Sequence, residues 1–200
     1  MNNKLYTAVG KLKMKDQNDV RILCVSIGQK EYILNEQEMV LWMELNYKVL
    51  NADEVHKLCG NKTWETGSNA EECIRRLVQR GLIAEGSGDT KEDMLYNLFA
   101  ELYVIPETEA PISTKEKSDE EKITRLIKYV VLSTAEIIKC IELNILNLHT
   151  DEEILDCLYS DDYTTSENIV YTVRYLSKRQ SVIEAVVNLY QCRQIRFDRI

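Results

Sequence analysis

The sequence contains few of the residues that build metal sites, phosphate-binding loops and rigid linkers. It has two histidines, seven glycines and two prolines among 200 residues. These counts exclude a histidine-rich metal site, a glycine-rich phosphate loop and a proline-rich linker. Six cysteines lie at least 14 residues apart, without a Cys-x-x-Cys pair, so no zinc-ribbon or thiol-redox motif is present. We expect reduced and mostly buried thiols.

Long apolar segments are also absent. No run approaches the ~18 to 20 uninterrupted apolar residues of a membrane helix, and residues 1–5 begin no apolar stretch of signal-peptide type. Hydrophobic residues still make up 44% of the chain and charged residues 29%, which is enough for an ordinary globular core. We expect a cytoplasmic globular protein without a membrane segment.

The net charge of −8 counts against general binding to nucleic acid, because such binding depends on neutralising phosphates. The charge is uneven, however. Residues 172–200 hold six basic and two acidic side chains, a local charge of +4. An acidic chain that binds DNA must concentrate positive charge in this way, so the C-terminal segment is the best candidate for phosphate contacts.

Two alignments within the chain indicate an internal repeat. Residues 34–46 recur as residues 132–144 with five of thirteen positions identical. Residues 74–80 align with residues 173–179 and keep an Arg, a Leu and a final Arg. Amphipathic helices also resemble one another by chance, so the alignments need independent support.

Helix-capping pairs supply that support. A Ser, Thr or Asn followed three positions later by Glu satisfies two backbone N–H groups at a helix start. The sequence has three such pairs in each half: Asn35/Glu38, Asn51/Glu54 and Ser68/Glu71, then Ser133/Glu136, Thr150/Glu153 and Thr164/Glu167. Together with apolar residues at helical spacing, they predict three short helices in each half, with Trp42 and Met43 in the core.

The remaining pattern predicts short strands and connecting helices. Strands are expected at residues 5–13, 20–27 and 30–34, and another at 82–85 before the turn at 86–88. Helices near 91–102 and 182–189 would cover the core or join the halves. The predicted fold is mainly α with small β-sheets (α+β), in two repeats. We place the N-terminal domain at 1–105, a polar linker containing both prolines at 106–121, and the C-terminal domain at 122–200.

The phrase Leu77-Val78-Gln79-Arg80-Gly81-Leu82-Ile83, which closes the third helix of the first half, resembles the link between recognition helix and wing in the winged helix-turn-helix family. The resemblance covers roughly residues 20–105 and 122–200 and implies two tandem winged-helix domains. The second half departs from it, because Gln180 and Ser181 stand where glycine and leucine are expected. A vaguer similarity links residues 20–58 to the small PqqD-like peptide-binding domains.

The family implies recognition helices at residues 69–80 and 167–179. A DNA-reading helix presents basic and amide side chains to bases and phosphates. Glu71 and Glu72 would repel phosphate at the start of the first helix, so the second helix is the better candidate. The candidate DNA-binding residues are Arg174, Tyr175, Lys178, Arg179, Arg193 and Arg196, with Arg75, Arg76 and Arg80 from the first half. A solvated, non-binding helix face is the alternative interpretation.

No residue pattern indicates catalysis. The carboxylate clusters at 152–162 are typical of solvated helix faces, the two histidines lack a second metal ligand at the right spacing, and Ser68 and Ser133 act as caps. We expect no enzyme activity, no cofactor and no metal.

Two functions remain open. The first is a tandem winged-helix transcription regulator that binds duplex DNA mainly through the third helix of the second repeat. The second is an acidic scaffold that binds a protein or peptide without DNA, with Trp64 as a candidate interface residue because it falls in a polar loop. A dimer is compatible with either function.

Overall fold

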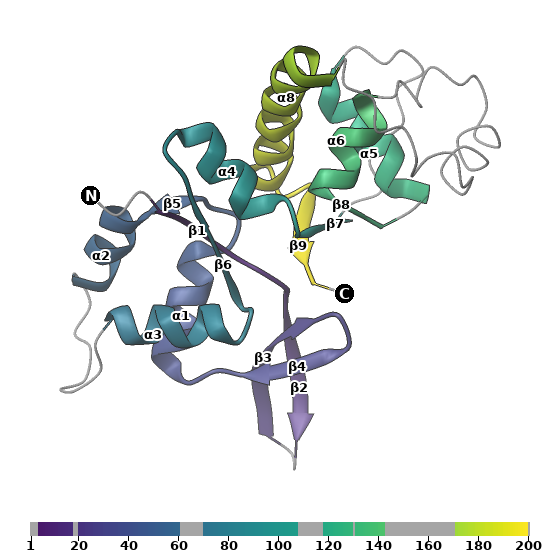
Figure 1. Ribbon diagram of the computed structural model, residues 1–200. Helices are drawn as coiled ribbons and strands as arrows, with labels where there is room; N and C mark the ends of the chain where they lie inside the picture. The colour runs from purple at the N-terminus through teal and green to yellow at the C-terminus, as the bar shows by residue number, and fades with distance from the viewer. Residues whose placement is uncertain are drawn as a thin grey trace.

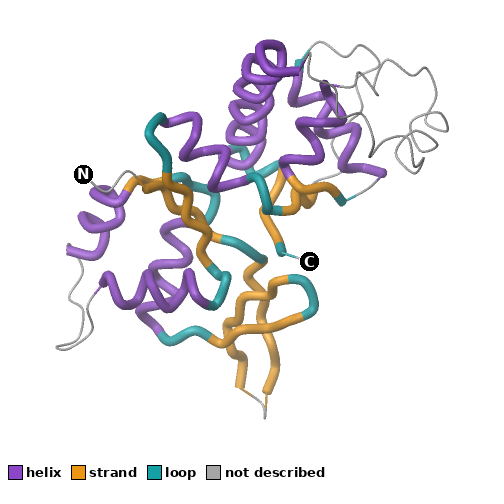
Figure 2. The backbone as a smooth tube through the Cα atoms, in the orientation of Figure 1, coloured by secondary structure: helices purple, strands orange, loops and turns teal. Residues whose placement is uncertain are grey.

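The computed structural model describes residues 4–17, 20–60, 70–107, 118–129, 131–142 and 171–199 (Figures 1 and 2). Helices and small antiparallel sheets alternate along these residues, which confirms the α+β class. No helix in the described part of the chain is long and apolar enough to cross a membrane. Of the four cysteines whose side chains are described, Cys24, Cys73 and Cys140 are buried and Cys192 is exposed.

The N-terminal half is built on a sheet with the strand order β5-β1-β6. Its strands are β1 (Lys4–Ala8), β5 (Leu50–Asn51) and β6 (Ile83–Ser87), and both neighbours run antiparallel to β1. Helices α1 (Glu36–Leu45), α2 (Ala52–Gly60), α3 (Ala70–Gln79) and α4 (Lys91–Phe99) pack around it. Trp42 of α1 is fully buried, and its Nε1 donates to the Val9 carbonyl at 3.1 Å.

The C-terminal half contains a sheet of the same form, with the order β8-β7-β9. Its strands are β7 (Tyr103–Pro106), β8 (Leu132–Ser133) and β9 (Ile195–Asp198). Helices α5 (Asp119–Tyr129) and α6 (Thr134–Glu142) pack against the long helix α8 (Tyr171–Gln191). In both sheets the strand that comes first in the chain is central, and a two-residue strand leads directly into a capped helix.

Matching helix ends show which segments of the halves correspond. After α3, Gly81 has φ +75° and the Leu82 N–H donates to the Leu77 carbonyl at 2.9 Å. After α8, Arg193 has φ +58° and the Gln194 N–H donates to the Leu189 carbonyl at 2.9 Å. Both are Schellman-type ends that turn the chain into the last strand. Residues 74–83 therefore correspond to residues 186–195.

The internal alignments found in the sequence were wrong in register. By its place after β8, helix α6 corresponds to α2, whereas the sequence match paired it with α1. Capping pairs caused this error, because Asn35/Glu38, Asn51/Glu54 and Ser133/Glu136 all form reciprocal caps. Such caps identify a helix start but not which helix starts there. The caps predicted at Ser68, Thr150 and Thr164 lie outside the described residues.

Helix α8 also differs from the prediction. It continues without a break through Gln180 and Ser181, so a helix ending at 179 and a second near 182–189 were wrong. Neither residue is a helix breaker, and the Ser181 hydroxyl donates to the Asp119 carboxylate of α5. Residues 167–170, at the start of that predicted recognition helix, lie outside the described residues.

Two segments differ from the predicted organisation of the chain. Residues 103–105, which the sequence placed with the N-terminal domain, pair with β8 and β9 of the C-terminal half. The strand expected at residues 5–13 is divided at Gly10, where φ is +96° and an added Cβ would lie 2.5 Å from the Ser26 carbonyl oxygen. Only glycine fits this bend, which sends the chain from one sheet into another.

That other sheet has the order β2-β3-β4 and consists of β2 (Lys11–Gln17), β3 (Val20–Ile27) and β4 (Lys30–Ile33). We call it the N-terminal arm. In Figure 1 the hairpin of β2 and β3 extends below the rest of the molecule. The arm is attached to the C-terminal end of the chain: the Gly10 N–H donates to the Phe197 carbonyl at 2.8 Å, and the Gly28 N–H to Asp198 Oδ1 at 2.8 Å.

The two halves share one hydrophobic core. Phe197 of β9 stacks on Phe99 of α4 with ring centroids 4.6 Å apart, and Tyr190 of α8 lies 4.6 Å from Phe197. The buried Tyr190 hydroxyl accepts the Tyr47 N–H at 2.9 Å and lies 3.0 Å from Thr7 Oγ1. Burial raises the pKa of Tyr190 to about 12. These contacts join the halves into a single packed unit.

Candidate functional site

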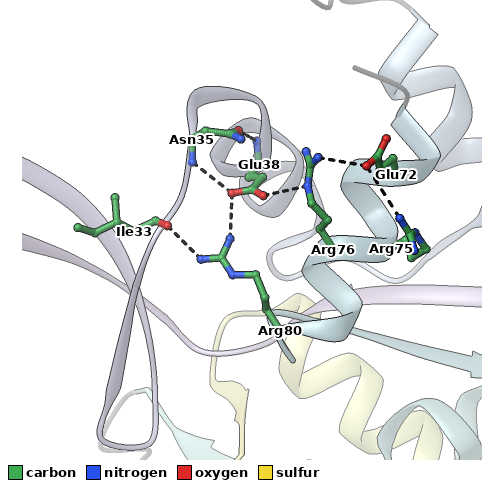
Figure 3. Close-up of polar contacts among 7 residues, drawn as sticks. All are labelled: Ile33, Asn35, Glu38, Glu72, Arg75, Arg76 and Arg80. Carbon is green, nitrogen blue, oxygen red and sulfur yellow. Dashed lines mark hydrogen bonds and ion pairs between the residues drawn. The ribbon is translucent and has the colours of Figure 1, made fainter. Parts of the chain in front are cut away.

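The arginines of α3 are held by a buried carboxylate (Figure 3). Glu38 of α1 is only 7% exposed at its side chain, and its two oxygens lie 3.5 Å from Arg76 Nε and 3.0 Å from Arg80. Glu38 also closes the capping box of α1, where its carboxylate accepts the Asn35 N–H. A buried carboxylate requires such partners. The two arginines therefore fasten α3 to α1.

Arg80 makes further contacts with the N-terminal arm. Its second terminal nitrogen donates to the Ile33 carbonyl at 3.0 Å, and its guanidinium lies 5.6 Å from the centre of the Tyr32 ring. Arg75 is more exposed than Arg76 and Arg80, and it lies 3.9 Å from Glu72 on the same helix. Two of the three first-half candidates for DNA contact are thus engaged inside the protein.

Two further candidate arginines have internal partners. Arg196 of β9 is 17% exposed, bonds Glu107 at 3.0 Å and lies 3.8 Å from Asp198. The Arg193 guanidinium lies over the Tyr47 ring at 5.5 Å, which is a cation–π geometry. The ion pair of Arg196 with Glu107 therefore joins β9 to the end of β7.

The side chains of the other candidates lie outside the described part of the chain. Arg174, Tyr175, Lys178 and Arg179 lie in the first turns of α8, where only the backbone is described. Trp64 and the carboxylates at 152–162 lie outside the described residues. Within the part of the chain that the structure describes, no group of three or more His, Cys, Asp or Glu side chains could hold a metal ion.

The N-terminal arm presents a surface that the sequence analysis missed. Five large hydrophobic side chains are exposed among the described residues, and three belong to the arm: Met14 at 62%, Leu23 at 42% and Ile33 at 55%. Met14 and Leu23 are directly opposite each other on β2 and β3, and Ile33 of β4 is opposite Cys24. Met43 of α1 is a fourth and is 51% exposed, so its assignment to the core was wrong.

The outer edge of β4 is open except at the Ile33 carbonyl, which accepts a hydrogen bond from Arg80. Ile27 and Lys30 flank the two-residue turn of the β3–β4 hairpin, so they form a hydrogen-bonded pair, as do Val25 and Tyr32. By alternation, the N–H and C=O groups of Glu31 and Ile33 point away from β3. The Arg80 contact with the Ile33 carbonyl agrees with this direction. No described strand pairs with this edge.

Basic side chains accompany the exposed apolar ones. Residues 11–33 carry five basic and three acidic side chains, in a chain whose net charge is −8. Lys15 hydrogen-bonds Glu31 at 2.6 Å, and this bond lowers the pKa of Glu31 and raises that of Lys15. The arm is thus a basic segment of an acidic chain, as residues 172–200 also are.

Sequence reasoning could have found only part of this surface. The Lys-x-Lys-x-Lys pattern of β2 is typical of an edge strand, which natural proteins protect with lysine. Met14 and Leu23, in contrast, lie in strand patterns whose apolar residues would be expected to face a core, so the sequence does not indicate that they are exposed. Their exposure follows from the projection of the arm, which depends on the bend at Gly10 and on the distant strand β9.

Comparison with known proteins adds no assignment: no model of a known protein family, no curated protein and no solved structure matches this chain.

Proposed function

We propose that this protein is a non-enzymatic interaction module that binds an extended, acidic segment of a protein partner along the N-terminal arm. The observation that carries the proposal is the open edge of β4 beside exposed apolar and basic side chains. An extended segment that adds a strand to a sheet edge gains main-chain hydrogen bonds, and pockets for alternate side chains give specificity.

The composition of the arm favours an acidic partner segment. Lys11, Lys13 and Arg21 are exposed on it, and Arg75 is exposed on the neighbouring helix α3. Opposite charge on the partner would accelerate its association with the arm, and the acidic remainder of this protein would repel the same segment elsewhere. Ile33, on the strand whose edge is available, would supply an apolar contact. Met14 and Leu23 lie on the opposite face of the arm, because Ile33 shares its face with Cys24 and not with Leu23.

We also propose that both halves are winged-helix-like units. The element orders α1-β5-α2-α3-β6 and α5-β8-α6-α8-β9 support this reading. In each unit the central strand comes from the preceding part of the chain, β1 or β7, instead of from a wing hairpin. In the first unit β6 is followed by helix α4, so the winged-helix resemblance concerns the helices and the sheet order and not the wing.

Duplex DNA binding by a transcription regulator is the second candidate function. It is favoured by Arg174, Lys178 and Arg179, which lie within two turns of α8; Arg174 and Lys178 are four residues apart and so share one face of the helix. It is disfavoured by the net charge and by the internal partners of Arg76, Arg80 and Arg196.

One pair of assays separates the two functions. Random peptides displayed on phage are selected against the purified full chain, and genomic duplex fragments are titrated at low and moderate salt. The proposal predicts enrichment of acidic peptides with alternating apolar residues, and DNA binding no stronger than that of an Arg174→Glu, Arg179→Glu variant. Salt-dependent DNA binding that this variant loses, together with no peptide enrichment, would establish the DNA-binding alternative.

A matched pair of variants locates the peptide. In Glu31→Pro the strand loses an N–H that points away from β3, a position where edge strands tolerate proline. Glu31→Gln removes the same carboxylate and keeps the N–H. Selected peptides should bind Glu31→Gln with little change and Glu31→Pro up to about tenfold more weakly, since one main-chain hydrogen bond to the peptide is lost.

A further inference from the structure

A cleft of about 460 Å³ lies between the two halves of the molecule, away from the N-terminal arm. One wall is formed by β1, the start of α2 and the first turns of α4, and the opposite wall by α8. Clefts of this volume at the junction of two structural units are common sites for small ligands.

The floor of the cleft is apolar. Leu5 and Leu95 contribute from the N-terminal half, and Ile183 and Val187 from α8. The two α8 residues are four positions apart and so lie on one face of the helix. A ligand that fills this cleft must therefore carry an apolar body.

The rim of the cleft is acidic. Glu54, Glu92 and Glu184 line it against the single basic residue Lys91. Glu54 is partly used, because one of its oxygens accepts the Asn51 N–H at 2.8 Å, and Glu184 accepts a bond from Gln180 at 3.3 Å. The Glu92 side chain makes no hydrogen bond or ion pair with another residue in the part of the chain that the structure describes.

This combination of floor and rim favours a cation over an anion or a neutral molecule. Several carboxylates around a cleft with low-dielectric walls concentrate negative potential inside it and raise the local concentration of cations. Carboxylates bind ammonium groups through charge-assisted hydrogen bonds, which are stronger than those between neutral groups.

We propose that the cleft binds an aliphatic ammonium ligand, whose methylene chain covers Leu5, Leu95 and Ile183 while its charged ends bond Glu92 and Glu184. The ammonium group can belong to a free polyamine or to a lysine side chain of a partner. This site is independent of the N-terminal arm, which has the opposite charge.

Isothermal titration calorimetry at low salt tests the site with two probes, spermidine and acetyl-trilysine amide. Glu92→Gln and Glu184→Gln should each weaken binding by about tenfold. Glu101→Gln is the matched control, because it removes an exposed carboxylate that does not line the cleft and changes the net charge equally. This control should weaken binding by less than about twofold.

The outcomes assign the source of the ligand or overturn the site. Spermidine binding with this pattern of variants indicates a free polyamine, and binding of the peptide alone with the same pattern indicates a partner's lysine. The proposal is overturned if neither probe binds, or if Glu101→Gln weakens binding as much as the two cleft variants do. Glu31→Pro should leave binding of either probe unchanged, which keeps this test separate from that of the arm.

Discussion

At the scale of single residues, the buried carboxylate of Glu38 joins α1 to Arg76 and Arg80. Glu38→Ala removes the reciprocal bond of the α1 capping box, although Asn35 still accepts the N–H of residue 38, and it leaves Arg76 and Arg80 without their shared carboxylate. We expect a loss of about 2–3 kcal/mol in the free energy of unfolding, since a largely buried ion pair is broken. Urea denaturation measures it. Glu36→Ala, at an exposed position of the same helix, should change stability by less than about 0.5 kcal/mol.

Tyr190 gives the second prediction at this scale. Its pKa is about 12 in the folded protein and about 10 in an unfolded chain. Between these values the unfolded chain releases the proton and the native state keeps it, so stability is full below pH 10 and falls by about 2–3 kcal/mol as the pH rises to 12. Tyr190→Phe should lack this part of the pH dependence. It should also cost about 1–3 kcal/mol at pH 7, because the Tyr47 N–H loses its acceptor. Equal slopes in both proteins above pH 10 would contradict this role.

At the scale of elements, the contact of β6 with α4 replaces the hairpin that a wing would form. A Cβ added at Gly86 would lie 2.3 Å from the Met94 carbonyl oxygen and 2.5 Å from the Leu98 nitrogen, both backbone atoms of α4. Gly86→Ala should therefore cost about 3 kcal/mol or more in thermal or urea unfolding. Gly81→Ala is the comparison: its Cβ meets only the Arg199 side chain at 3.7 Å, so it should cost about 1 kcal/mol for the positive φ alone. Equal losses would show that α4 does not pack closely on β6.

Local signals predicted the elements well and their pairing poorly. The capped starts of α1, α2 and α6 and the glycine end of α3 follow from a few neighbouring residues, and the structure confirms them. The strand partners of β1 and β7 are tens of residues away, and no short pattern specifies them. In the sequence, Arg80 and Arg196 were candidates for DNA contact because they are basic. The structure shows that each has a carboxylate partner inside the protein, Glu38 for Arg80 and Glu107 for Arg196.

At the scale of the whole molecule, the last strand connects the halves. Phe197 of β9 stacks on Phe99 of α4, and the Phe197 carbonyl accepts the Gly10 N–H. Phe197→Ala should cost about 3–5 kcal/mol. Both tryptophans of the chain belong to the N-terminal half, so tryptophan fluorescence reports on that half alone. We expect its unfolding midpoint to shift together with that of far-UV circular dichroism; a fluorescence midpoint that does not move would mean that the halves fold independently.

The central claim is that the outer edge of β4 receives an extended partner segment. Amide hydrogen exchange, followed residue by residue with and without a selected acidic peptide, tests it most directly. In the free protein the amides of Glu31 and Ile33 should exchange quickly, while those of Lys30 and Tyr32, which bond β3, are protected. Bound peptide should slow exchange at Glu31 and Ile33. Bound peptide that leaves both amides unprotected, while protecting a different surface, would contradict the account.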